Sequence, residues 1–301
     1  MKFGTRLQYG LLLGACKVVG WLPDWFLYHC LLDVLYFALY RVARYRVGVV
    51  RTNLRNSFPE QTEAGLRKIE RGFYRQLAEV FVDTIDMASI SRRKLAQRMV
   101  FVNAREMEER LHGQSWMAGL AHYGSWEYIN GYGLVSDHQV SGIYHPVHNK
   151  AFNAYFKYIR SRFGTVPIAM HELLRAVVRN EADPRARRLT LGLIADQIPP
   201  FNEIQYWGWF LNQPTAFYTG MEKLALRFGM PVFFMHVRKV RRARYEAWFE
   251  EIYDGKEPVG EGVIVDRYVK RLEKMIRERP ELWMWSHRRW KHNMPEDAVC
   301  H

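Results

Sequence analysis

From residue 99 onward, short apolar runs alternate with segments of helical periodicity, and this alternation limits the possible folds most strongly. The runs typical of strands are residues 100–102, 116–121, 140–144, 165–170, 189–195 and 230–237. The segments typical of helices are residues 127–134, 150–163, 171–180, 215–228 and 263–279. Strands alternating with helices predict one layered α/β domain with a largely parallel central sheet flanked by helices.

The region before this alternation is helical in pattern. Apolar positions recur three and four residues apart from Thr62 to Met87, which predicts a long scaffold helix.

Two apolar stretches, residues 9–22 and 25–40, are separated by Pro23-Asp24 and interrupted by Lys17, His29 and Asp33. Neither reaches the length of a clean membrane span, so we expect two helices in the membrane interface. A hairpin packed on the core is the alternative. The predicted domains are residues 1–45, membrane-associating, and residues 46–301.

The charge of the chain indicates an anionic partner. Its 301 residues carry a formal net charge of +13, and 15% are aromatic, including ten Trp. An anionic membrane or a nucleic acid would satisfy this charge. The basic residues are dispersed and no nucleic-acid-binding module is recognisable, so we expect no nucleic acid partner. The arginines of residues 41–55 form either a solvated helix face or a strip that meets lipid headgroups.

Metal chemistry is not indicated. The three cysteines, Cys16, Cys30 and Cys300, lie far apart without a C-x-x-C pair. His171-Glu172 continues as Leu-Leu-Arg, so the zinc helix H-E-x-x-H is absent. A lone His-Glu pair has too few ligands for catalytic zinc. We expect no metal and no cofactor.

His122 and Glu127 are the leading catalytic candidates. Residues five apart cannot share one face of a continuous helix. The two can meet if His122 lies on a turn after a strand and Glu127 in the first turn of the next helix. Gly124 and Ser125 would provide that turn, with Ser125 as N-cap. Glu127 would then orient the imidazole, leaving the other ring nitrogen as a general base. Alternatively, Glu127 is there only because an acid is favourable near a helix start.

At these residues the chain resembles the glycerolipid-type acyltransferases and their H-x4-[DE] motif. It is most similar to the late lipid A biosynthesis acyltransferases, the lauroyl/myristoyl transferases of Gram-negative bacteria. Further similar blocks follow in the family's order and cover nearly the whole chain. They are Tyr144–Asn149, Arg160-Ser-Arg162, Ala195-Asp196-Gln197, Pro214-Thr-Ala216 and Trp283–Lys291. His145, where many relatives have Arg, and the Asp-Gln-Ile-Pro-Pro block depart from the family pattern.

The resemblance implies transfer of a fatty acyl chain from a thioester of acyl carrier protein or coenzyme A to a hydroxyl of a lipid A precursor, in lipopolysaccharide synthesis. It implies the cytoplasmic face of the inner membrane, with acyl carrier protein, anionic lipid and a glycolipid acceptor as partners. A thioester donor needs a base, oxyanion donors and a groove for the chain, but no enzyme nucleophile. His122 and Glu127 are accordingly the expected catalytic pair.

The resemblance also implies substrate-binding residues. The arginine block would hold an acceptor phosphate, and we favour Arg162 over Arg160 because it lies nearer the following turn; the helix dipole alone could also explain both. Asp196 ends a predicted strand, where sites often form, or else begins a turn. The other expected contacts are Tyr144, Asn149, Arg288 and Arg289. The aromatic loop of residues 201–213 would line the acyl groove or pack in the core.

Two other functions remain open. A sister acyltransferase could use the same motif on a lysophospholipid, glycolipid or aminoacyl lipid. A non-catalytic basic membrane-binding protein would use His122 and Glu127 only structurally. Acyl chain length and acceptor are left undetermined by the sequence.

Overall fold

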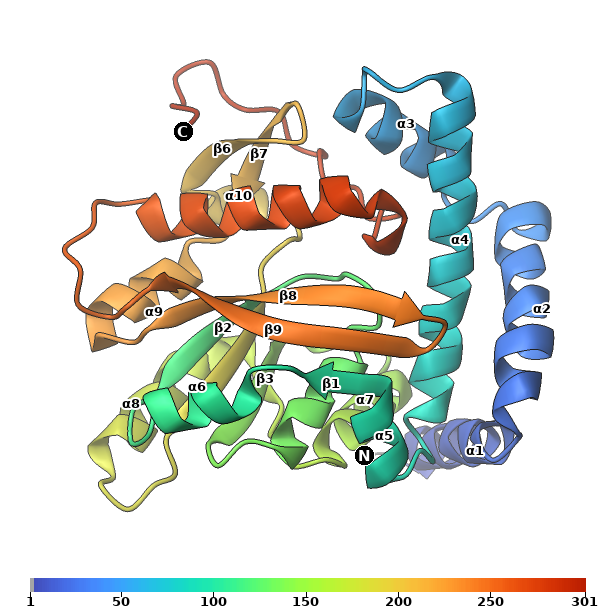
Figure 1. The fold of residues 1–301 in the computed structure, drawn as a ribbon, viewed down its shortest axis with the longest axis horizontal. Coiled ribbons are helices and arrows are strands. Elements are labelled where there is room, and N and C mark those ends of the chain that lie inside the picture. Colours follow the sequence, from blue (N-terminus) through green and yellow to red (C-terminus); the bar gives the residue numbers. More distant parts are fainter. Residues whose placement is uncertain (1–2) are drawn as a thin grey trace.

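The computed structural model describes residues 3–301, which form a mixed α/β fold around a seven-stranded sheet (Figure 1). The strand order is β1-β9-β8-β2-β5-β3-β4, and the five strands from β8 to β4 run parallel to one another. β9 is antiparallel to β8 and parallel to β1. The bounds are β1 Met99–Phe101, β2 Trp116–Leu120, β3 Gln139–Tyr144, β4 Ile168–Ala169, β5 Leu189–Ile194, β8 Val232–Arg241 and β9 Arg244–Tyr253. The expected α/β class and mostly parallel sheet are confirmed.

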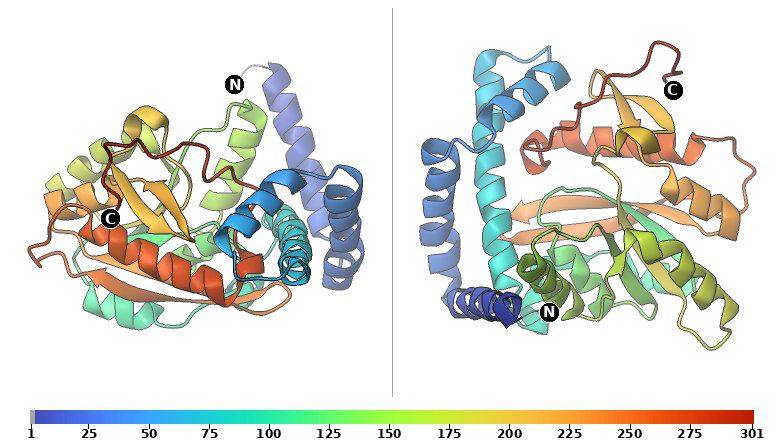
Figure 2. Two further views of the ribbon diagram at one scale, coloured as in Figure 1. Left: turned by 90° about the horizontal axis from the view of Figure 1, so that it is seen from above. Right: turned by 180° about the vertical axis from the view of Figure 1, so that it is seen from behind.

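Helices cover both faces of this sheet (Figures 1 and 2). α9 (Gly220–Phe228) and α10 (Val263–Glu278) lie on one face, together with the separate hairpin of β6 (Tyr206–Phe210) and β7 (Gln213–Phe217). α6 (Ala104–Arg110), α7 (Lys150–Ser161) and α8 (Leu173–Ala182) lie on the other, with α5 (Arg92–Arg98) near the sheet edge. Because both faces are covered, every residue of β2 is buried.

The long helix α4 (Glu63–Asp86) stands across the end of the sheet toward which β8 points (Figure 1). It begins at Thr62, whose hydroxyl accepts a 3.2 Å hydrogen bond from the Gly65 amide and so caps the helix. β2, β5 and β3 run parallel to β8, so their carboxyl ends point to the same side. The predicted helix at residues 62–87 is confirmed, and it forms one wall of the space at the strand ends.

Strand register brings two polar residues to the same level. β2 and β5 pair in parallel with Leu120 opposite Ile194. His122 follows Leu120 by two residues and Asp196 follows Ile194 by two residues, so the two segments leave the sheet side by side at the same level. The Ala195 amide still donates to the Leu120 carbonyl, at 3.2 Å, which continues the pairing beyond the strands.

The N-terminal segment forms helices against α4. α1 (Phe3–Gly20) is followed by a continuous helical stretch over residues 26–42, with α2 (Leu32–Phe37) between two wider π-type turns, and then by α3 (Val47–Ser57). Within residues 3–301 no single helix is long and apolar enough to cross a membrane. The helices 26–42 and 47–57 reach that length and apolar composition only when they are taken together, and the chain bends by 87° between them. Both predicted apolar stretches are helical, as expected.

Large apolar side chains stay exposed on these helices. They include Phe3, Leu7, Leu11, Trp21, Trp25, Val34, Phe37 and Val42. The same segment also packs inward, since Leu27, Tyr28 and Leu32 form a small core with Ala78 and Val82 of α4. The segment therefore has one face on the protein and one apolar face open.

One expected helix was wrong, one open alternative is decided and one strand was missed. Residues 215–228 are not one helix, because residues 213–217 pair as β7 in the hairpin and only 220–228 are helical. For residues 201–213 the core alternative is mostly the one that the structure shows, since Tyr206, Trp207, Phe210 and Leu211 are buried, whereas Phe201 and Trp209 are exposed. β9, a ten-residue strand, was not predicted.

Candidate active site

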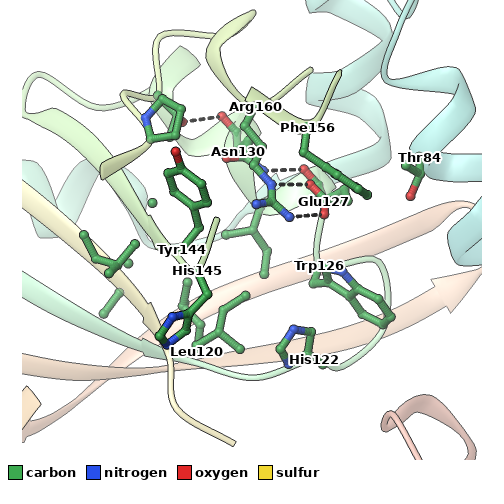
Figure 3. Close-up of a pocket in the computed structure, with 18 of the residues that line it drawn as sticks. Thr84, Leu120, His122, Trp126, Glu127, Asn130, Tyr144, His145, Phe156 and Arg160 are labelled. Atoms are coloured by element: carbon green, nitrogen blue, oxygen red, sulfur yellow. Dashed lines mark hydrogen bonds and ion pairs between the residues drawn. The ribbon is translucent and has the colours of Figure 1, made fainter. Parts of the chain in front are cut away.

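A cavity of about 480 Å³ opens at the carboxyl ends of β2, β5 and β3, between the sheet, α4 and α7 (Figure 3). Its lining is largely apolar, with side chains such as Leu120, Ile129, Ile143, Phe156 and Met235. A few polar groups also line it, and they include His122, Glu127, Asn130, Tyr144 and Arg160. An apolar cavity with a few polar groups at the strand ends of an α/β sheet is the usual form of a ligand site.

His122 is held by Asp196, which follows β5 at the position that matches His122 after β2. The imidazole Nδ1 lies 2.8 Å from Asp196 Oδ1, and the His122 backbone N–H donates to Asp196 Oδ2 at 2.9 Å. This grip fixes both the ring and the backbone of the turn after β2. Nε2 is left toward the cavity, where its near polar neighbour is the Gln197 amide nitrogen at 3.4 Å. An imidazole with a carboxylate on one nitrogen and the other facing a cavity can act as a general base.

Asp196 is a buried carboxylate that the structure keeps ionised. It is 2% exposed and accepts a third hydrogen bond, 2.8 Å from the Trp283 indole Nε1. Burial by itself would raise the pKa of this carboxyl, but the charge of His122 and the hydrogen bonds from His122 and Trp283 together lower the pKa below its usual value. A permanently charged Asp196 favours the His122 tautomer with its proton on Nδ1 and stabilises the imidazolium.

Glu127 does not orient His122, contrary to the sequence prediction. Its carboxylate forms a two-pronged ion pair with Arg160 of α7, with Nε to Oε2 at 3.0 Å and Nη2 to Oε1 at 2.6 Å (Figure 3). Burial would lower the pKa of the Arg160 guanidinium, but the Glu127 charge and hydrogen bonds raise it above its usual value. The half-buried Arg160 guanidinium therefore binds the buried Glu127 carboxylate, and the histidine pairs with an acid 74 residues away.

His287 is a second, neutral imidazole beside this pair. Its Nε2 accepts a 3.2 Å hydrogen bond from the Ile198 amide. Burial, and then the charge of Arg289, lower the pKa of His287 to about 4, although Asp196 opposes the shift. Because it stays uncharged at neutral pH, His287 adds no positive charge next to His122 and fixes the loop that follows Asp196.

The sequence model of a family described as bacterial lipid A biosynthesis acyltransferase matches residues 5–292. The chain belongs to this family. It is accordingly an acyltransferase of lipid A synthesis, as the resemblance implied. A search of curated proteins gives no match.

In this acyltransferase the predicted arginine block is divided between two tasks. Arg160 reaches the cavity, whereas Arg162 donates to the Met87 and Ile90 carbonyls at 2.5 and 3.1 Å and so ties α7 to the end of α4. The preference for Arg162 was therefore wrong, since Arg160 is the arginine that reaches the cavity. The preference rested on the position of Arg162 near the turn after α7, but at that position its side chain holds the end of α7 against the Met87 and Ile90 carbonyls.

The remaining predicted contacts also separate. Tyr144 lines the cavity at the end of β3. Asn149 does not: its side-chain Oδ1 caps α7 by accepting from the Ala151 and Phe152 amides. The prediction that Ser125 is an N-cap was wrong. The short helix that follows (Tyr128–Leu134) has Glu127 as its N-cap residue, and Ser125 is buried.

Arg288 and Arg289 differ in the same way. Arg288 is exposed, but Arg289 is 1% exposed, donates to the Ala216 carbonyl and lies over the Phe217 ring. Burial, only partly opposed by Asp196, lowers the pKa of Arg289 to about 10. Arg289 is therefore a core residue out of reach of a substrate, and its expected binding role was wrong.

Sequence reasoning missed several residues of the site. Trp126 packs edge-on against the His122 ring, and Gln197, Trp283 and His287 surround the His122–Asp196 pair. The available signal was that Gln197 and Trp283 belong to the same similar blocks as Asp196 and Arg288. Which of them touch His122 depends on the folded chain.

Proposed function

We propose that this acyltransferase moves a fatty acyl chain from an acyl thioester, carried by acyl carrier protein or coenzyme A, to a hydroxyl of a lipid A precursor. The observation that carries the proposal is His122, clamped by Asp196 on Nδ1 and presenting Nε2 to an apolar cavity. The apolar cavity walls suit an acyl chain, and the polar side chains among them suit the reacting groups.

In the proposed reaction His122 Nε2 removes the proton of the acceptor hydroxyl while its oxygen attacks the thioester carbonyl carbon. The carbonyl oxygen takes up the electron pair, and a tetrahedral intermediate forms. The intermediate collapses with cleavage of the C–S bond, and the imidazolium returns its proton to the leaving thiolate. Asp196 stabilises the imidazolium between these steps. The products are the ester and the free thiol, and no covalent enzyme intermediate is required.

Two further cavity groups have proposed roles. The Gln197 side-chain amide, beside Nε2, would donate to the oxyanion. Arg160 uses Nε and Nη2 on Glu127, while its Nη1 makes no hydrogen bond within residues 3–301 and would bind an anionic group of the acceptor. Glu127 is thus proposed to hold the arginine in position rather than the histidine.

The proposed location is the cytoplasmic face of the inner membrane, where an acyl carrier protein and a glycolipid acceptor would both be present. The exposed apolar side chains of the N-terminal helices support contact with a membrane surface.

The test compares wild type, His122→Ala and the exposed-histidine control His112→Ala. Each is incubated with acyl carrier thioester and lipid A precursor, and product is followed by mass spectrometry. His122→Ala is expected to lose about 10²–10⁴-fold in rate, the usual contribution of a positioned base, with His112→Ala unchanged. Equal rates for all three would remove the assignment. Product only with lysophospholipid acceptors would favour the sister acyltransferase.

A further inference from the structure

A second concave site lies outside the catalytic cavity, where the N-terminal helical segment meets α3 and α4. This cleft has a volume of about 470 Å³. It is lined by Tyr40, Arg41, Arg51, Leu54, Arg55, Glu63, Leu66, Arg67, Glu70 and Arg71. None of these residues lines the catalytic cavity, which meets α4 further along, at residues 77–84.

The acidic residues of the cleft are already neutralised. Glu70, 2% exposed, is held by Arg51 through Nε and Nη2 at 3.0–3.2 Å. Glu63 pairs with Arg55, with Nε to Oε1 at 3.0 Å and Nη2 to Oε2 at 3.3 Å. These two pairs account for both carboxylates of the cleft.

Three arginines of the cleft are left without an acidic partner within residues 3–301: Arg41, Arg67 and Arg71. Arg67 and Arg71 are four residues apart on α4, an arrangement of like charges that destabilises a helix. The Arg71 Nε donates to the Arg67 carbonyl at 3.2 Å, which holds its guanidinium against the helix. Arg41 lies over the Tyr40 ring, 5.3 Å from its centroid. Three guanidiniums around a hollow, two of them held in position, are complementary to a phosphate group.

The surroundings favour a lipid as the bearer of that phosphate. Tyr40 stacks on Tyr74 of α4 at 4.6 Å between ring centroids, so the end of the N-terminal segment is fixed at the cleft. On that segment Phe37 and Val42 are 58% and 69% exposed, on either side of Tyr40 and Arg41 in sequence. Apolar side chains next to an unpaired basic hollow match a molecule with hydrocarbon tails and an anionic head.

We propose that this cleft binds the phosphate headgroup of an anionic membrane lipid, with Arg41, Arg67 and Arg71 as its ligands. Phosphomonoester headgroups, which carry more than one negative charge, fit three unpaired cations better than phosphodiesters do. The site goes beyond the proposed acyl transfer, and it would fix how the enzyme sits on a membrane surface independently of what occupies the cavity.

The test uses the full chain in two triple variants with equal loss of charge. Arg41→Gln/Arg67→Gln/Arg71→Gln removes the unpaired arginines of the cleft. Arg175→Gln/Arg179→Gln/Arg185→Gln removes exposed arginines of α8 and the loop after it. Binding is measured by vesicle flotation on phosphatidylcholine alone and with added phosphatidic acid or phosphatidylglycerol, and circular dichroism and thermal unfolding verify the fold of each variant.

The cleft variant is expected to lose about 100-fold in affinity for phosphatidic acid vesicles, the α8 variant a few-fold at most, and neither should change on phosphatidylcholine. Equal losses by the two variants would overturn the proposal, because net charge alone would explain them. Calorimetry with inorganic phosphate is a separate arm. Phosphate binding that the cleft variant loses, with vesicle binding unaffected, would assign the cleft to free phosphate and overturn the lipid headgroup. If the cleft variant and the α8 variant behave alike both in vesicle flotation and in calorimetry with phosphate, the cleft is not an anion site and the proposal is overturned.

Discussion

At the scale of single residues, the site depends on which carboxylate pairs with which basic side chain. Two acids and two bases lie near the cavity mouth, and the structure sorts them into His122–Asp196 and Glu127–Arg160. The geometry of the side chains in the folded chain decides these pairs, and the spacing of the residues along the sequence does not. Arg160 presents a planar fork that matches both oxygens of Glu127, whereas Asp196 offers one oxygen to the ring and one to the backbone N–H of His122.

This sorting predicts a kinetic difference. Asp196→Asn removes the charge that stabilises the imidazolium and disturbs the tautomer, so kcat should fall by about 10²–10⁴-fold with little change in KM. The exposed Asp183→Asn is the matched control and should be silent. Steady-state kinetics with saturating acyl thioester would measure both. Full activity of Asp196→Asn, together with loss of activity in Glu127→Gln, would restore the pairing expected from the motif.

The sequence could not predict the pair of His122 with Asp196, because the two residues lie 74 positions apart along the chain. The spacing of His122 and Glu127 showed that a turn must separate them, and Gly124, at φ +62°, makes that turn. It could not show that Asp196 leaves its strand beside His122, because that follows from the pairing of β2 with β5. The similar blocks named the right neighbourhoods, and only the fold assigned Arg160, Arg162 and Arg289 to different tasks.

At the scale of elements, one buried group joins three of them. Asp83 of α4 is 1% exposed and accepts from Tyr28 of the N-terminal segment at 2.7 Å and from Tyr128, in the helix after Glu127, at 3.1 Å. The two phenols are 2.9 Å apart. Asp86 and Arg98 lie in the same cluster, and Glu79 lies one turn earlier on α4. The N-terminal helices are thereby connected to the loop that carries the catalytic candidates.

Asp83 also predicts a dependence of stability on pH. Burial, and then the negative charge of Glu79, raise the pKa of this carboxyl to about 7. The folded state therefore holds a proton that the unfolded chain releases near pH 4, and the contribution of Asp83 to stability falls as pH rises from about 4 to 7. The slope from this one group is at most about 1.4 kcal/mol per pH unit.

In Asp83→Asn this contribution should disappear. Denaturant unfolding at a series of pH values between 5 and 8 would show the wild type losing stability relative to the variant as pH rises. The exposed Asp183→Asn serves as control and should run parallel to wild type. A difference between wild type and Asp83→Asn that stays constant across the series would rule out titration of this group.

Element prediction succeeded where a pattern was long or apolar on both faces. α4 and α10 have clear helical stripes, and β2 is an uninterrupted apolar run. β9 alternates buried Tyr245, Ala247 and Phe249 with the half-buried residues Glu246, Trp248 and Glu250. This is a strand signal that the helix-strand alternation did not lead us to expect. The β6–β7 hairpin turns at Leu211 and Asn212, both at positive φ without a glycine, and so carries no usual turn sequence.

At the scale of the whole molecule, the apolar surface is concentrated on the N-terminal helices. Trp21 and Trp25, 73% and 61% exposed, lie in and beside the loop between α1 and the helical stretch 26–42. Indole side chains are favoured at the boundary between water and lipid.

We expect Trp21→Ser/Trp25→Ser to weaken binding to phosphatidylcholine vesicles by at least about 10-fold, because each indole contributes a large apolar area. Vesicle flotation measures the effect. Trp209→Ser, at a comparably exposed tryptophan on β6, is the control and should bind as wild type. An equal loss in Trp209→Ser would place the lipid-contacting surface over the β6–β7 hairpin instead.

The parallel pairing of Leu120 with Ile194 has an evolutionary consequence. Side chains on a strand alternate between faces, so deleting one residue between 116 and 120, or between 189 and 194, would leave His122 and Asp196 out of phase even if every buried side chain were replaced by another of similar size. Insertions and deletions in this lineage should therefore accumulate in connections such as residues 183–187, while the two strands keep their lengths.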